Sequence, residues 1–262
     1  MRIHPAIVAI GVLAWGPPAT AQAPAAADLW RVATGSLASP AALQDGPSGI
    51  FWNPAAGRDA PLAVGAQIVQ TSDVVGLSGF LLSASHQLTP GLRIGVVAGR
   101  FEMRDLVRTT TSPNSVDGSI PLYEQSVAAD VAAGGRTAQI GLAVRVHDAR
   151  FDRLRDHGVT ADVGIRYRPA RRLLLAAATH FLSPTLSDEP TTDYYGAAEL
   201  IVLDRPALAG QPTRLALRYG AALRHTGDLD HTAALGLALN GQFRVDAALT
   251  SESAFGQRVW RA

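Results

Sequence analysis

The 262-residue chain contains no cysteine, which excludes a disulfide framework and thiolate metal sites. It also contains no lysine, since all 23 of its basic residues are arginine. Its 22 acidic residues bring the formal net charge to +1, and no basic patch stands out, so nucleic acid is not a predicted partner. No apolar run approaches the ~18 residues that a transmembrane helix requires, which leaves no candidate for a helical span.

The first residues have the pattern of a secretory signal peptide. Arg2 supplies a positive start, residues 7–15 form a short apolar core, and residues 19–21 (Ala-Thr-Ala) form an A-x-A cleavage site. The pattern predicts a cleavable signal peptide over residues 1–21 and therefore export. An uncleaved N-terminal anchor is the alternative. A lipoprotein anchor is excluded, because no cysteine follows the cleavage site.

What the chain has in abundance is strict alternation of apolar and polar side chains. In residues 213–224, Leu215 and Leu217 point one way, while Arg214 and Arg218 point the other way. Successive side chains of a β-strand face opposite sides, so this period of two predicts strands with one apolar and one polar face. Almost no helical periodicity competes with it, apart from one short helical piece expected around residues 28–33.

The alternation recurs in about twelve segments. The predicted strands are 62–71, 75–88, 92–104, 122–133, 137–148, 158–168, 172–182, 195–203, 213–225, 231–239, 242–251 and 254–262. Tight turns at Pro90-Gly91, Gly134-Gly135, Pro169-Ala170 and Asn240-Gly241 alternate with longer polar loops at 105–121, 149–157 and 183–194. Short and long connections therefore gather at opposite rims of an up-and-down meander, as they do in bacterial outer-membrane barrels. The last strand is short and is expected to be incomplete.

The polar face indicates which side of the sheet is inside. It mixes arginine and aspartate with glycine and alanine, which suits a confined lumen better than a solvated surface. The predicted lumen charge network consists of Asp130, Arg145, Asp162, Arg166, Arg214, Arg218, Arg244 and Asp246. These charges either pair with one another or attract anionic solutes. The apolar face carries Tyr167, Phe181 and Tyr219 near strand ends, which resembles an aromatic girdle.

The predicted fold is therefore all-β: an antiparallel up-and-down transmembrane β-barrel of about 12 strands with an N-terminal plug segment. Residues 22–60 form the plug and residues 61–262 form the barrel, which places the protein in the bacterial outer membrane. A secreted soluble β protein is the alternative, because alternation alone does not say which face is outside.

One local motif precedes the first strand. Residues 45–56 read Asp-Gly-Pro-Ser-Gly-Ile-Phe-Trp-Asn-Pro-Ala-Ala. This segment resembles the N-terminal signature of the FadL-like outer-membrane barrels, including the related PorV-type proteins, over roughly residues 38–64. The resemblance implies a hatch folded into the barrel, with Phe51, Trp52, Asn53 and Pro54 as gate or ligand-binding residues. A simple Asn-Pro turn at the entrance to a strand is the alternative.

The resemblance also implies a function. FadL-like barrels suggest a passive transporter of small hydrophobic compounds, with membrane lipid and a small hydrophobic ligand as partners. The alternative is a non-transporting scaffold or secretion-system component of the PorV type, for which the sequence names no protein partner. An enzyme is not predicted, because none of the histidines lies in a serine or cysteine nucleophile motif and no Gly-x-Ser-x-Gly occurs. No cofactor and no metal is predicted.

Overall fold

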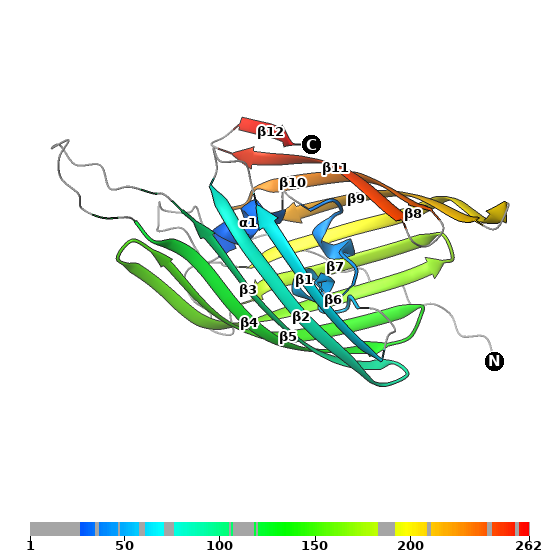
Figure 1. The fold of residues 1–262 in the computed structure, drawn as a ribbon, viewed down its shortest axis with the longest axis horizontal. Helices are drawn as coiled ribbons and strands as arrows, with labels where there is room; N and C mark the ends of the chain where they lie inside the picture. Colours follow the sequence, from blue (N-terminus) through cyan, green and yellow to red (C-terminus); the bar gives the residue numbers. More distant parts are fainter. Residues whose placement is uncertain are drawn as a thin grey trace.

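A computed structural model of the chain contains one antiparallel sheet whose strands follow one another in sequence order (Figure 1). The residues described are 27–34, 37–46, 48–57, 61–70, 76–104, 106, 118, 120–182, 192–208, 211–239, 243–254 and 257–261. The predicted signal peptide, residues 1–21, lies outside this described part of the chain. Among the described residues, no helix is long and apolar enough to cross a membrane.

The sheet has twelve strands, each antiparallel to the next, in the order β1 to β12. The strands are β1 (Leu62–Gln70), β2 (Leu77–Thr89), β3 (Leu92–Met103), β4 (Leu122–Gly134), β5 (Ala138–Phe151), β6 (Leu154–Ala170), β7 (Leu173–Leu182), β8 (Asp193–Leu208), β9 (Gln211–Leu223), β10 (Leu229–Leu239), β11 (Phe243–Ala254) and β12 (Gln257–Arg261). The all-β, up-and-down prediction is confirmed. Within the described residues, β1 and β12 are the outer strands of the order, and no pairing joins them to each other.

Two predicted connections are wrong. The polar stretch 149–157 is not a long loop, because β5 continues to Phe151 and β6 begins at Leu154. Asp152 makes the tight turn between them with a φ of 54°, which an aspartate tolerates better than most residues. The turn expected at Pro169-Ala170 also lies within a strand: β6 runs to Ala170, and its pairing with β7 shifts register between Tyr167 and Ala170. The shift accommodates a proline, which has no N–H to give to the ladder.

The strands have their polar face buried and their apolar face exposed. In β5, Val144 and Val146 are 52 % and 58 % exposed, whereas Arg145 between them is fully buried. The same pattern runs through β4, where Val127 is 59 % exposed while Asp130 is buried. A soluble sheet has the opposite arrangement, with apolar side chains in the core.

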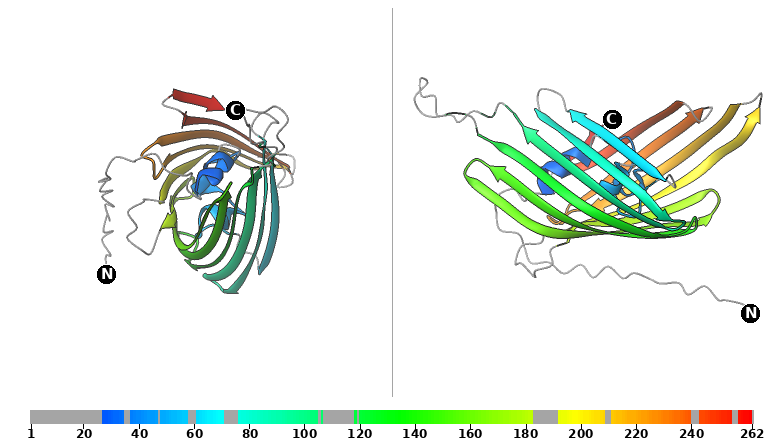
Figure 2. Two further views of the ribbon diagram at one scale, coloured as in Figure 1. Left: turned by 90° about the vertical axis from the view of Figure 1, so that its left-hand side faces the viewer. Right: turned by 60° about the horizontal axis from the view of Figure 1, so that its bottom comes forward.

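The N-terminal segment lies against the concave face of the sheet, inside its curve (Figures 1 and 2). It contains helix α1 (Ala27–Thr34), the 3₁₀ turn η1 (Ala41–Leu43) and the short helix α2 (Gly49–Trp52). The short helix predicted around residues 28–33 is therefore present as α1. Because this segment covers the concave face, the polar side chains of that face are buried against it.

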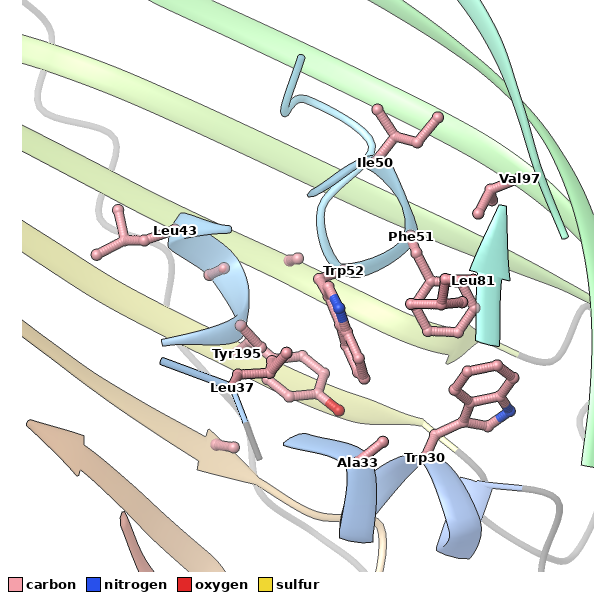
Figure 3. Packing of buried hydrophobic residues seen from close by; sticks show 14 of the residues in the cluster. Trp30, Ala33, Leu37, Leu43, Ile50, Phe51, Trp52, Leu81, Val97 and Tyr195 are labelled. Carbon is pink, nitrogen blue, oxygen red and sulfur yellow. The ribbon is translucent and has the colours of Figure 1, made fainter. Parts of the chain in front are cut away.

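An aromatic cluster joins the segment to the sheet. The ring of Trp30 lies 4.2 Å from that of Phe51 and 4.4 Å from that of Phe101 on β3, measured between centroids. Leu81 on β2 belongs to the same cluster, and the ring of Trp52 lies 4.8 Å from that of Phe51, between centroids (Figure 3). Each aromatic pair of this kind contributes about 0.5–1.5 kcal/mol beyond the burial of its area. The cluster therefore fixes the position of α1 and α2 against the sheet.

Candidate gate and charge network

The Asn-Pro-Ala turn is the most buried polar part of the N-terminal segment. Asn53 is 0 % exposed, and its Nδ2 donates to the carbonyl oxygen of Ala42 in η1 at 2.9 Å. Its Oδ1 accepts from the backbone N–H of Ala55 at 2.9 Å, which is the usual geometry of an Asx turn. One side chain thus closes the turn and ties it to the preceding part of the segment.

Two glycines of the sheet let this turn come close to its backbone. Gly141 on β5 and Gly164 on β6 are register partners. A Cβ on Gly164 would collide with Oδ1 of Asn53 and would lie 2.9 Å from Cδ of Pro54. A Cβ on Gly141 would collide with the carbonyl group of Pro54. We call these two residues the glycine floor, because they carry no side chain and the turn lies directly against their backbone.

Guanidinium and imidazole N–H groups of the sheet donate to three backbone carbonyls, those of Phe51 and Trp52 at the end of α2 and that of Pro54 just after it. Nη2 of Arg145 donates to Phe51 at 3.2 Å, and Nη2 of Arg93 donates to Pro54 at 2.6 Å. The carbonyl of Trp52 accepts from Nε2 of His180 at 2.6 Å. A carbonyl only accepts, so this contact places the ring proton of His180 on Nε2. The last carbonyls of a helix have no partner within it, and here the sheet provides one.

The structure brings two of the predicted charges together at the centre of this contact. Nε and Nη2 of Arg145 lie 3.0 and 2.5 Å from Oδ2 of Asp162, and both side chains are almost completely buried. Nη1 donates to Oγ of Ser126 at 3.0 Å, and the guanidinium lies 4.2 Å from the centroid of the Phe51 ring. A buried ion pair needs such extra contacts to offset the loss of hydration. Arg145 therefore links Phe51, one of the predicted gate residues, to the sheet.

Phe181 corrects the prediction of an aromatic girdle. It is 3 % exposed rather than outward-facing, and it has a φ of 55°. Register shifts between Ala161 and Val163, so the alternation of β7 breaks and two successive side chains, His180 and Phe181, are buried. The break also turns the N–H of Phe181 toward Oδ1 of Asp162, at 2.9 Å. The other girdle candidates, Tyr167 and Tyr219, are exposed as expected.

A second charge cluster contains three of the predicted residues. Nε of Arg218 lies 2.7 Å from Glu199, and its Nη1 lies 2.6 Å from Asp246. Arg214 pairs with the same Glu199 at 2.6 Å. Sequence reasoning missed Glu199, although it is the register partner of Arg218 across β8 and β9. The strand register, which the alternation alone does not specify, would have found it.

The remaining predicted charges belong to separate pairs. Asp130 pairs with Arg93 at 2.9 Å, and Arg166 pairs with Asp45 of the N-terminal segment at 3.3 Å. The side chain of Arg244 lies outside the described residues. The predicted network is therefore divided into local clusters along the concave face, and two of its partners, Arg93 and Asp45, were not among the predicted residues.

One further cluster anchors the end of α1. Arg224 donates to Asp193 at 3.0 Å, to Asp230 at 2.8 Å and to the hydroxyl of Tyr195 at 2.9 Å. Its Nη2 also donates to Oγ1 of Thr34, at 2.7 Å. The five residues come from α1, β8, the end of β9 and β10, so no single local motif signals their contact.

A cavity of about 560 Å³ opens at the rim that carries the β4–β5 and β6–β7 turns, which we call the tight-turn rim. It is lined by Asp45, Gly57, Arg136, Thr137, Ala138, Gln139, Arg166, Arg168, Arg171, Leu174, Ile201, Asp204 and Arg214. Among the described residues, no three His, Asp or Glu side chains are arranged to hold a metal ion. The lining residues come from the sheet and, in the case of Asp45 and Gly57, from the N-terminal segment. Arginine is the most frequent polar residue among them.

No family model, no curated protein and no solved structure matches the chain. The function is therefore argued from the fold, the buried contacts and the cavity.

Proposed function

We propose that the chain is a bacterial outer-membrane β-barrel protein whose N-terminal segment plugs the lumen, and that it acts as a passive transporter. The observation that supports this proposal is the sidedness of the sheet. Its outward face carries exposed apolar side chains on successive strands, among them Val127, Val144, Val146 and Val159, each more than half exposed. The inward face carries buried arginine and aspartate.

The proposed environment explains an otherwise costly surface. Apolar area in water costs about 25 cal/mol per Å², and soluble monomers rarely expose a continuous apolar patch beyond a few hundred Å². Against lipid tails this cost disappears, while the buried charges stay within the lumen, where they pair. The up-and-down topology fits such a barrel, since every strand interior finds its backbone partners on neighbouring strands. Closure between β1 and β12 completes the proposed barrel.

The plug gives the barrel a gate. Phe51 to Pro54 are held by side chains of the sheet rather than by a continuous strand pairing, so the segment is able to leave without breaking the sheet. Arg145, His180 and Arg93 each hold one of its backbone carbonyls. In this proposal, solute passes only when some of these contacts open. The hydrophobic class of solute implied by the FadL-like resemblance stays a prediction.

The scaffold function is the second candidate, and the closed packing of the same segment favours it. The aromatic cluster around Trp30, the glycine floor and the Arg224 cluster all hold the segment in place. A plug fixed this firmly suits a protein that presents its surface to a partner and conducts nothing.

Uptake into liposomes separates the two candidates. The mature chain is reconstituted as wild type, as Asn53→Ala and as the control Gly196→Ala, since a Cβ on Gly196 meets nothing within 4 Å. Solutes of increasing hydrophobicity are offered to each preparation. A gated transporter passes at least one solute faster than empty liposomes, and Asn53→Ala passes it faster than wild type and the control do. If none of the three exceeds empty liposomes, transport is excluded and the scaffold function remains.

A further inference from the structure

The cavity at the tight-turn rim differs in charge from the rest of the concave face. Five arginines line it against two aspartates, Asp45 and Asp204. Arg166 and Arg214 have acidic partners, Asp45 and Glu199. The other three arginines, which we call the vestibule arginines, are Arg136, Arg168 and Arg171. Within the described part of the chain, the side chains of these three arginines make no ion pair and no hydrogen bond; the backbone N–H of Arg168 donates to the carbonyl oxygen of Thr137 in the strand pairing.

The vestibule arginines come from neighbouring connections. Arg136 lies in the turn between β4 and β5, Arg171 lies in the turn between β6 and β7, and Arg168 lies at the end of β6. All three are exposed. The arginines deeper in the sheet, such as Arg145 and Arg218, are instead buried and bonded to carboxylates. The positive charge of the deeper arginines is therefore neutralised by carboxylates, whereas the charge of the vestibule arginines is not.

The cavity has the size and extent of a ligand site. Its volume of about 560 Å³ lies within the range of small-molecule pockets. A smaller cavity of about 140 Å³ shares Asp45, Arg166 and Arg214 with it and extends inward to Arg218. Positive charge gathered in a cleft between low-dielectric walls raises the local concentration of anions.

The chemistry of arginine specifies the ligand further. Its planar guanidinium offers parallel N–H donors that match the oxygens of phosphate or carboxylate groups. Three unpaired guanidinium groups around one cavity suit a ligand with more than one anionic oxygen group. A neutral or cationic solute gains nothing from them.

We propose that the vestibule arginines bind a small phosphate-bearing anion from the aqueous side of the tight-turn rim. The proposal rests on the proposed function in one respect: it makes such anions the solutes that meet the plug from that side. Binding itself requires no conduction, so it is measured separately from transport.

The test uses the purified full mature chain in neutral detergent, with inorganic pyrophosphate as the probe and calorimetric titration at low salt. The variant Arg136→Ala/Arg168→Ala/Arg171→Ala removes the three charges. The control Arg153→Ala/Arg155→Ala/Arg172→Ala removes three exposed arginines that do not line the cavity. We expect saturable binding to wild type, a loss of about tenfold or more in the vestibule variant, and a change within about twofold in the control. Circular dichroism confirms that all three proteins keep the same strand content.

Two results would overturn the proposal: no saturable binding to wild type, or an equal loss in the control. A lipid headgroup offers the same phosphate chemistry, so a second titration uses vesicles that contain phosphatidylglycerol. Binding to those vesicles without binding of free pyrophosphate would assign the arginines to lipid and reject the solute. Pyrophosphate is also offered as a solute in the liposome assay, and its binding without flux of any solute would reject the transport function and leave the vestibule site in place.

Discussion

Gly141 and Gly164 face each other across β5 and β6, and together they give the Asn53–Pro54 turn direct contact with the backbone of the sheet. Neither glycine has a positive φ, so their role is space rather than backbone conformation. The motif before the first strand and the glycines of two later strands are therefore parts of one contact. The fit between them explains why Asn53 is fully buried.

A side chain on this glycine floor should displace the turn. We expect Gly164→Val to lower the free energy of unfolding by about 1–3 kcal/mol, because the added atoms collide with Asn53 and Pro54. Urea unfolding measures this loss, and limited proteolysis reports whether residues 37–57 become accessible. The matched control is Gly196→Val on β8, where a Cβ meets nothing. Equal losses in the two variants would show that the loss comes from replacing a strand glycine and not from the turn.

The buried pair of Arg145 and Asp162 should contribute far more to the free energy of unfolding than an exposed pair does. We expect Arg145→Ala to cost about 3–5 kcal/mol, since it leaves Asp162 charged and buried without its partner. The control is Arg104→Ala, which removes the exposed partner of Glu102 and should cost at most about 1 kcal/mol. Urea unfolding of both variants makes the comparison. Similar costs would mean that Arg145 is hydrated in solution, in conflict with its burial against Phe51.

The left-handed backbone conformation of Phe181 reverses the order of stability expected for an alanine and a glycine substitution at this position. Both Phe181→Ala and Phe181→Gly delete the ring that packs near Arg145. Only glycine adopts a φ of 55° without a steric cost, so Phe181→Gly should be the more stable of the two by about 1 kcal/mol. Melting temperatures of the two variants decide it. A more stable alanine variant would show that this residue does not hold a left-handed conformation.

The fold was predictable because alternation is local, whereas the contacts of the site were not. The alternation that identifies a strand is visible within about ten residues, and the order of strands in a meander follows the order in the sequence. The pairing of Glu199 with Arg218 depends on register, which a period of two leaves undetermined. The break in alternation at Phe181 depends on a shift in pairing between β6 and β7. Neither feature leaves a mark in the local sequence.

The N-terminal segment shows the same limit. The motif around Asn53 was visible as a turn, but its partners come from β3, β5, β6 and β7. The loop expected at 149–157 was assigned by polarity, yet those residues extend two strands beyond the point where their apolar alternation ends. Polar residues at strand ends look like loops when the opposite strand is unknown.

In the proposed barrel, the apolar convex face of the sheet meets lipid, while the polar concave face meets water and the plug. The chain has no cysteine, so single cysteines are introduced without interference. Val144→Cys lies on the exposed apolar face of β5, and Gln139→Cys lines the cavity on the opposite face of the same strand. Each variant is labelled with a fluorophore, reconstituted in vesicles, and quenched either by nitroxide lipids or by aqueous iodide. We expect nitroxide lipids to quench the label at Val144→Cys and iodide to quench the label at Gln139→Cys; quenching of both labels by iodide alone would show that the apolar face lies in water and would rule out the membrane barrel.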